Sequence, residues 1–115
     1  MDQTAIDEAV YRELQATAGA EFVVDLVRTF LDEAPGMLAG LSKARLEGDG
    51  ESFRRTAHSL KSNGITFGAR GLAALARELE QKGLDADSSR DAQRLSALQS
   101  EYARAEAALK ALIDG

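Results

Sequence analysis

The stretch FRRTAHSLKSNGITF, residues 53–67, decides the fold because its apolar residues recur every three or four positions. At about 100° per residue these positions fall within about 40° of one direction, so they share one face of a helix. That face is made by Phe53, Ala57, Leu60, Gly64 and Phe67. Asp49 precedes the stretch as a candidate N-cap, and Gly68 follows it as a candidate turn residue. The stretch therefore predicts an amphipathic helix that buries this face.

Helical spacing continues on the N-terminal side of this stretch. We expect a short helix over about residues 4–17, and a second one that carries Phe22 and Phe30 and ends before Pro35. Proline fits the first turn of a helix and disrupts a helix interior. Pro35 therefore predicts the start of a separate helix that ends near Gly48.

Two more helices are predicted on the C-terminal side. One carries the leucines of residues 72–79 and stops at Gly83, because glycine readily adopts the left-handed conformation that ends helices. Ser88 and Asp91 resemble a capping box that opens a long last helix. Short connections between amphipathic helices favour an all-α, antiparallel up-down four-helix bundle with one or two additional short N-terminal helices. The same leucine spacing is compatible with a long coiled coil, but the frequent glycine joints argue against it.

The composition supports one helical domain over residues 1–115. Of the 115 residues 29% are charged and 44% are hydrophobic, and the chain contains no cysteine, which excludes disulfide scaffolds and cysteine nucleophiles. The net charge of −5 argues against binding of the whole chain to nucleic acid or to an anionic membrane. The longest apolar run, residues 72–76, is far shorter than the ~20 residues of a membrane helix. We expect a cytoplasmic protein.

The residue inventory leaves few options for a metal site or a hydrolase. With one histidine and no cysteine the chain lacks the usual zinc ligands, and Arg55 stands where a di-metal Glu-x-x-His motif needs glutamate. Residues 85–96 fail as a calcium loop at their glycine and glutamate positions. His58 and Ser62 share a helix face, but no nucleophile elbow surrounds the serine. We therefore expect no intrinsic metal or cofactor.

The single histidine is the residue most suited to chemistry. His58 lies about 140° from the apolar face of its helix, so its imidazole should face solvent. An exposed histidine is most often a surface residue without a function, but its neighbours at helical spacing are informative here. They are Arg54, Arg55, Lys61 and Ser62. Three of them are cationic, and the small serine leaves the ring open.

An exposed apolar residue completes this surface. Ile65 is about 20° from His58 on the helical wheel and should also face water. A cationic rim, an accessible imidazole and an exposed apolar side chain together predict a docking face for a partner that carries an anion. Neutral imidazole is a good nucleophile for phosphorus, and nearby cations should both disfavour a protonated ring and stabilise an incoming phosphoryl group. A metal ion for such a transfer should come from the partner.

At this level of detail the sequence resembles the histidine-containing phosphotransfer (HPt) domain family. The resemblance rests on residues 57–64 (AHSLKSNG), on residues 67–69 (FGA), and on the leucines and the Leu-Glu pair of residues 72–80. Upstream, residues 30–35 (FLDEAP) and the Gly-Asp pair at 48–49 also match the pattern of the family. The resemblance covers nearly the whole chain.

The resemblance implies a phosphocarrier. It implies that His58 accepts a phosphoryl group from an aspartyl-phosphate of a response-regulator receiver domain and passes it to another receiver, and that Lys61 stabilises the phosphoryl group. The implied partners are receiver domains and a sensor or hybrid histidine kinase, with Mg²⁺ bound by the receiver and no kinase or phosphatase activity in this chain. The sequence departs from many members at Ser62, where they have glycine, and at Asn63, where they have serine.

The docking rim is inferred from the residues and not carried over from the motif. It consists of Arg54, Arg55, Ser62 and Ile65. We expect a monomer, because the polar helix faces leave no large apolar surface for self-association. A non-phosphorylated helical interaction module of the same fold is the alternative function, since a fold does not determine its function.

Overall fold

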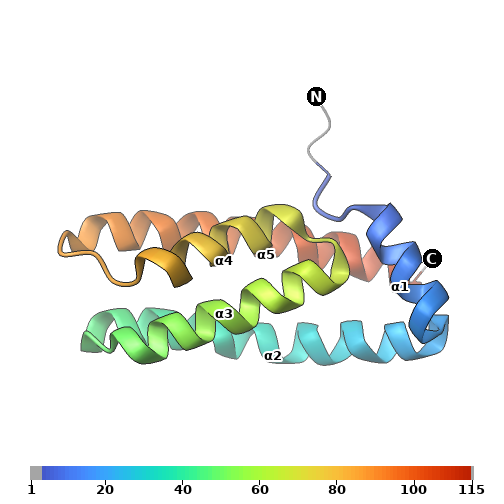
Figure 1. Cartoon of the computed structure of the whole chain (residues 1–115), viewed down its shortest axis with the longest axis horizontal. Helices are drawn as coiled ribbons and strands as arrows, with labels where there is room; N and C mark the ends of the chain where they lie inside the picture. Colours follow the sequence, from blue (N-terminus) through green and yellow to red (C-terminus); the bar gives the residue numbers. More distant parts are fainter. Residues whose placement is uncertain (1–3, 115) are drawn as a thin grey trace.

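The computed structural model describes residues 4–114, and Figure 1 shows its five α-helices in chain order. Their bounds are α1 Glu8–Ala18, α2 Ala20–Glu47, α3 Gly50–Phe67, α4 Arg70–Lys82 and α5 Ser88–Asp114. Helices α2 to α5 run up and down beside one another as an antiparallel bundle, and α1 is one additional short helix at the N-terminal end. The predicted fold class is confirmed.

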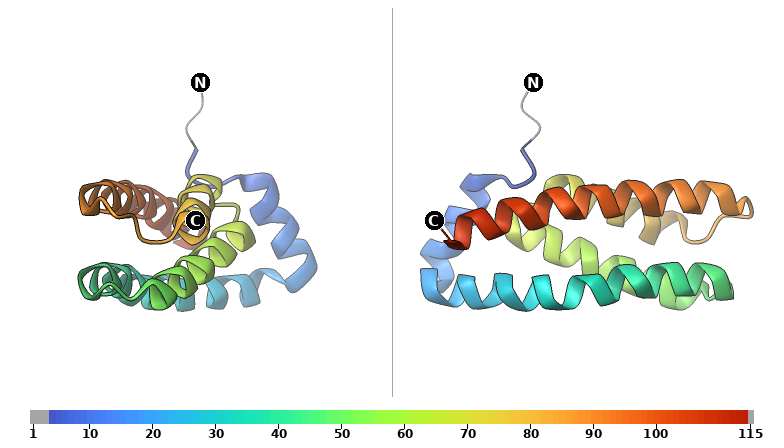
Figure 2. Two further views of the ribbon diagram at one scale, coloured as in Figure 1. Left: turned by 60° about the vertical axis from the view of Figure 1, so that its left-hand side comes forward. Right: turned by 180° about the vertical axis from the view of Figure 1, so that it is seen from behind.

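The four long helices enclose one core. Each contacts the next along the chain, and α5 closes the ring against α2. Helix α1 crosses one end of the bundle, where it contacts α2 and α3 (Figure 2). No helix within residues 4–114 is long and apolar enough to cross a membrane.

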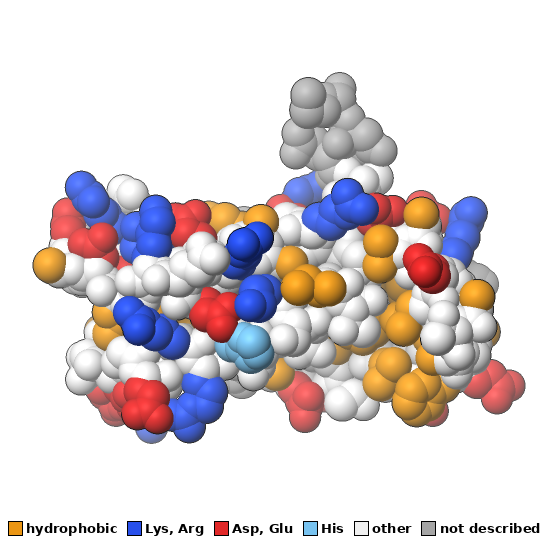
Figure 3. Space-filling view, viewed as in Figure 1, with side chains coloured by type: hydrophobic (Ala, Val, Ile, Leu, Met, Phe, Trp, Pro, Cys, Tyr) orange, Lys and Arg blue, Asp and Glu red, His pale blue; other side chains and the backbone are white. Residues whose placement is uncertain are grey.

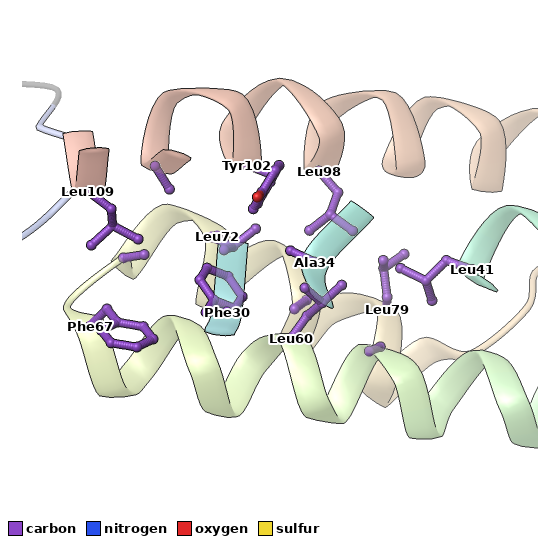
Figure 4. Packing of buried hydrophobic residues seen from close by; sticks show 14 of the residues in the cluster. Phe30, Ala34, Leu41, Leu60, Phe67, Leu72, Leu79, Leu98, Tyr102 and Leu109 are labelled. Atoms are coloured by element: carbon purple, nitrogen blue, oxygen red, sulfur yellow. The ribbon is translucent and has the colours of Figure 1, made fainter. Parts of the chain in front are cut away.

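All four bundle helices contribute side chains to the core (Figure 4). At its centre the ring of Phe30 lies 5.6 Å from the ring of Phe67 and 5.9 Å from the ring of Tyr102, which it meets edge-on. Such pairs add about 0.5–1.5 kcal/mol to the stability that comes from burial alone. Burial raises the pKa of the Tyr102 hydroxyl to about 12. The aromatic cluster thus joins α2, α3 and α5.

Helix α3 agrees with the prediction from residues 53–67. The five residues of its apolar face are all buried. At its N-terminus Asp49 Oδ1 accepts a hydrogen bond from the backbone N–H of Ser52 at 3.1 Å. At its C-terminus Gly68 has a φ of 77°, which a residue with a side chain rarely adopts. The predicted cap, stripe and turn are therefore confirmed.

The turn from α3 to α4 is held closely on two sides. A Cβ atom on Gly64 would lie 3.0 Å from the Cβ of Ala73 and 3.0 Å from its backbone nitrogen, so the two helices cross almost in backbone contact. A Cβ on Gly68 would lie 2.8 Å from the carbonyl oxygen of Asp7, and the N–H of Asp7 donates to the Gly68 carbonyl at 2.8 Å. These contacts fix the position of α4 relative to α3.

The prediction of a helix boundary at Pro35 is wrong. Helix α2 continues through this residue as one helix of 28 residues. An interior proline costs about 3 kcal/mol because it removes a hydrogen bond and crowds the preceding turn. Phe30 and Ala34 before it and Leu41 after it are buried on one continuous face, and their burial offsets that cost. Pro35 itself is exposed, so its ring lies outside the buried face of the helix.

Two smaller expectations are also corrected. Phe22 is 55% exposed, and the neighbouring Val23 is buried in its place, because the buried face of α2 follows a slightly different phase. Helix α1 begins at Glu8 and not near residue 4, since the side chain of Asp7 caps it.

The capping box predicted at the start of α5 does not form. The carboxylate of Asp87 accepts from the backbone N–H of Ser89 at 3.0 Å and takes the capping position instead of Ser88. Asp91 turns inward, where it is 2% exposed and accepts a hydrogen bond from the backbone N–H of Asp85 at 2.9 Å. The carboxylate of Asp91 thus hydrogen-bonds to the backbone of the loop before α5 and does not cap the start of the helix.

Candidate functional site

The imidazole of His58 lies on the outer surface of α3, as the helical wheel predicts. Its side chain is 58% exposed. Figure 3 shows the histidine on the face formed by α3 and α4, with acidic and basic side chains beside it. One ring edge is therefore accessible to a partner.

A carboxylate from the next helix joins the histidine to a lysine. Glu80, on α4, places Oε2 at 2.6 Å from Nδ1 of His58. Its other oxygen, Oε1, lies 2.6 Å from Nζ of Lys61. The side chains of Glu80 and Lys61 are 25% and 23% exposed, so both are more sheltered than the imidazole. The site is thus a three-residue cluster centred on the carboxylate.

The cluster fixes the position of the ring hydrogen. The Lys61 ammonium first, and the His58 ring second, lower the pKa of the Glu80 carboxyl by hydrogen bonding to it. Glu80 is therefore ionised at neutral pH, and an ionised carboxylate can only accept hydrogen bonds. Nδ1 of His58 must then carry the hydrogen that it donates to Glu80. In a neutral ring this leaves Nε2 with a free lone pair.

This arrangement corrects one expectation. The sequence predicts a ring whose charged neighbours are cations, but the closest charged group in the structure is the Glu80 carboxylate, and Lys61 binds that carboxylate. The reason is tertiary: α4 brings in a residue that is 22 positions away in the chain. The ring is accessible, as predicted, but its surroundings are balanced in charge.

Glu80 was missed as a site residue although the hairpin geometry points to it. In an antiparallel helix pair, residues equally far from the turn are brought level with each other. His58 is ten residues before Gly68, and Glu80 is eleven residues after Ala69. These equal distances from the turn, and the Leu79-Glu80 pair among the residues of the resemblance, are the features of the sequence that indicate a place for Glu80 beside His58.

The predicted docking rim is only partly assembled around the histidine. Ile65 is 61% exposed, and Ser62 is exposed too, as expected. The side chain of Arg54 lies against Gly83 at the end of α4. Arg55 pairs with Glu51 at 3.5 Å in an exposed contact on α3. The two arginines are thus engaged in contacts away from the Glu80 cluster.

A groove continues from Ile65 along the junction of three helices. Its volume is about 480 Å³, and it contains more apolar than polar surface. It is lined by Val10 of α1, by Gly64, Ile65 and Gly68, and by Arg70, Ala73, Ala74 and Arg77 of α4. Arg77 is three residues before Glu80 on α4, so the two share a helix face. The sequence did not reveal this groove, because α1 and α4 meet α3 there only in the folded chain.

Within residues 4–114, no group of three or more histidine or acidic side chains is arranged to hold a metal ion. The cluster of His58, Lys61 and Glu80 contains one nucleophilic nitrogen, one cation and one anion. These groups can accept, orient and stabilise a transferred anionic group.

Comparisons with known proteins agree with this geometry. The family model described as "Hpt domain" matches residues 25–111. Among solved structures, the crystal structure of histidine-containing phosphotransfer protein B (HptB) from Pseudomonas aeruginosa PAO1 is similar, with a TM-score of 0.83 and 25% sequence identity. The similarity covers 98% of this chain and 97% of that chain. A search of curated proteins found no match.

Proposed function

Because the chain belongs to the Hpt domain family, it is a histidine-containing phosphotransfer protein of a phosphorelay, and we propose that His58 is its phosphoacceptor. Proteins of this family are phosphocarriers and not enzymes themselves, and their partners are receiver domains and histidine kinases. The observation that supports His58 is that its side chain is exposed while its Nδ1 is hydrogen-bonded to a carboxylate. It is the one histidine of the sequence, it is 58% exposed, and Glu80 binds Nδ1 so that Nε2 stays free.

The proposed reaction uses that free nitrogen. Nε2 of His58 attacks the phosphorus atom of an aspartyl-phosphate on a receiver domain. The Nε2–P bond forms as the P–O bond to the aspartate breaks, and the electron pair leaves with the aspartate carboxylate. The reverse reaction delivers the group to another receiver. Phosphoryl transfer depends mainly on positioning and on charge stabilisation, which a carrier and its partner share.

Lys61 is proposed to stabilise the phosphoryl group. Its ammonium is one helical turn from His58 and is held on the same side of α3 by Glu80. An ammonium group has three hydrogens, so one can remain on Glu80 while the others bind phosphoryl oxygens. Mg²⁺ is proposed to come from the receiver domain.

We propose that the receiver docks over the ring and towards Ile65. The groove beside Ile65 offers an apolar surface with arginines at its edge, which suits a partner face of apolar and acidic residues. Ser62 contributes by being small, and Arg54 and Arg55 form the opposite, N-terminal border of the docking rim. We further propose that residues 1–115 act as a single domain, as a cytoplasmic monomer, without binding nucleic acid or membranes.

The test is transfer of radiolabelled phosphate. A panel of receiver domains is phosphorylated with a small-molecule phosphodonor and incubated with this protein. We expect the protein to take up label that is labile in acid and stable in base, and we expect His58→Gln to take up none. Ser59→Ala is the matched control on the same helix, because the Ser59 hydroxyl donates to the Arg55 carbonyl at 3.3 Å and lies outside the docking rim, and it should keep the label.

Two outcomes would contradict the assignment. Label that persists in His58→Gln would show that another residue is the acceptor. A wild-type protein that binds receivers but takes up no label would favour the non-phosphorylated interaction module.

A further inference from the structure

The basic side chains of this chain differ in whether the protein itself offsets their charge. Most of them pair with a carboxylate of the chain, as Lys61 does with Glu80. Within residues 4–114, the ones that form no such ion pair are Arg28, Lys43, Arg45, Arg54 and Arg77. Arg45 hydrogen-bonds to Ser88 instead. Of the others, Arg54 and Arg77 lie on α3 and α4, the two helices that carry the His58 cluster.

These two arginines lie on opposite sides of the contact between His58 and Glu80. The guanidinium of Arg54 lies against Gly83, which is three residues after Glu80 on α4. Arg77 is three residues before Glu80 and lines the groove at the junction of α1, α3 and α4. About 9 Å of helix separates Gly83 from Arg77. The histidine therefore lies between two guanidinium groups, and Figure 3 shows basic side chains on more than one side of it.

The charge of this face comes mainly from the same two residues. The His58 cluster has no net charge while its ring is neutral, because the Lys61 ammonium and the Glu80 carboxylate offset each other. Arg54 and Arg77 are exposed, and no carboxylate of residues 4–114 pairs with them. The whole chain carries a net charge of −5, so it repels an anionic partner at long range. The two arginines therefore mark the place where such a partner is attracted.

Two other arginines on these helices contribute less to that attraction, because each of them is already paired. Arg55 lies 3.5 Å from Glu51, and Arg70 lies 2.7 Å from Asp7. Their neighbours in the sequence do not predict this difference, which appears only when the ion pairs of the folded chain are known.

We propose that Arg54 and Arg77 select the receiver domain, each by binding an acidic side chain of the receiver, one on either side of its phosphorylated aspartate. This inference rests on the proposed function of His58 and adds the chemistry of the partner surface. A guanidinium suits the role, because its planar fork binds a carboxylate through two parallel hydrogen bonds. Charges at the rim of an interface mainly raise the association rate and reject wrong partners. Receivers with basic residues at these two places are therefore excluded.

Association rates of Arg54→Gln and Arg77→Gln with a receiver domain test the proposal. The receiver is the one to which the wild type transfers label fastest, and binding is followed by stopped-flow fluorescence. Each substitution should lower the association rate constant on the order of five-fold at low salt, and the double variant should combine the two losses. The losses should shrink at about 1 M salt, where charges are screened beyond about 3 Å.

Arg28→Gln is the matched control. It removes the same charge from another exposed arginine without an ion pair in residues 4–114, but this arginine lies on α2, which carries no residue of the docking rim. We expect it to bind the receiver as the wild type does. All of these variants should keep the wild-type Tm, because the replaced side chains are exposed and form no ion pair with the described residues.

The panel of receiver domains tests the selection itself. Association with the wild type should be faster for receivers that carry more acidic residues around the phosphorylated aspartate. In the double variant of Arg54 and Arg77 these differences should become smaller. The transfer rate at saturating receiver should stay at the wild-type value, because the two arginines bind the receiver surface and not the phosphoryl group.

Three results would overturn the inference. One is an association rate of Arg54→Gln or of Arg77→Gln that equals the rate of Arg28→Gln, since the contact then has fewer than two sides. Another is unchanged association with slower transfer at saturation, which would assign the arginines to the phosphoryl group. The third is a loss of the same size at low and high salt, which would indicate packing and not charge. Absence of label on wild-type His58 is a failure of the proposed function and is detected before any variant is compared.

Discussion

Replacing Gly64 by alanine tests whether the close crossing of α3 and α4 holds the bundle together. A Cβ at this position would lie 3.0 Å from the Cβ, 3.0 Å from the backbone nitrogen and 3.1 Å from the Cα of Ala73. Two of these atoms are backbone atoms, so they can move only if α4 moves. The added methyl group must therefore push the two helices apart.

The net effect follows from two opposing terms. Overpacking a tight contact costs about 1–3 kcal/mol, and contact with backbone at 3.0 Å suggests the upper part of that range. Alanine in place of glycine in a helix interior stabilises the helix by about 1 kcal/mol, because alanine has the higher helix propensity. We therefore expect Gly64→Ala to lower the free energy of unfolding by about 1–2 kcal/mol. For a chain of 115 residues, that lowers Tm by roughly 4–8 °C.

Urea and thermal denaturation followed by circular dichroism measure this effect. Gly36→Ala is the control, because Gly36 is exposed in α2 and a Cβ there would meet nothing within 4 Å. We expect the control to raise the free energy of unfolding by up to about 1 kcal/mol. The same substitution should thus have opposite signs at the two positions. An increase in Tm for Gly64→Ala would refute the reasoning, since α4 would then yield without cost.

Four further predictions concern the core, the helix cap and the docking face. Leu60→Ala should cost about 2–5 kcal/mol in urea denaturation, because Leu60 is fully buried and leaves a cavity. Hydrogen bonds from Ser52 lower the pKa of the Asp49 carboxyl. The wild type should therefore be more stable than Asp49→Asn, and this extra stability should be fully present above the unfolded pKa near 3.8. That advantage should disappear as the pH falls through the lower folded pKa, and equal acid denaturation of the two proteins would contradict it. Lys61→Ala should slow phosphoryl uptake or shorten the lifetime of the phosphorylated protein while Tm stays nearly unchanged, and unchanged transfer would exclude its role. Ile65→Asp should weaken receiver binding in a titration while the helical content stays the same, and unchanged affinity would place the docking face elsewhere.

The sequence predicted α3 well because the information for this helix is local. The apolar stripe, the Asp49 cap and the turn at Gly68 all lie within 20 consecutive residues. The orientation of His58 follows from the same helical period. Features that depend only on spacing along one helix could therefore be read from the chain.

The continuity of α2 could also have been recognised, but a strong local rule hid it. Proline normally interrupts a helix, and this rule outweighed the pattern in the prediction. The buried residues of α2 nevertheless keep their period on both sides of Pro35, at Val27, Phe30 and Ala34 before it and at Leu41 after it. An apolar face that stays in phase across a proline indicates that tertiary burial will override the local cost.

The role of Glu80 and the groove could not be derived from local patterns, because they form between helices. Glu80 is one of 19 acidic residues, and most acidic side chains on helix faces are simply solvated. Only the folded α3–α4 pair places this carboxylate within 2.6 Å of both His58 and Lys61. The groove beside Ile65 likewise requires α1, α3 and α4 together.

Because the cluster is divided between α3 and α4, its reactivity depends on the one turn that joins these two helices. His58 and Lys61 lie on α3 and Glu80 lies on α4, and the turn that begins at Gly68 joins the two helices. A denaturant or a temperature that opens this turn will break the contacts among the three side chains while the distant ends of α2 and α5 are still folded. Loss of transfer should thus be an early sign of local opening, ahead of any change in overall helicity.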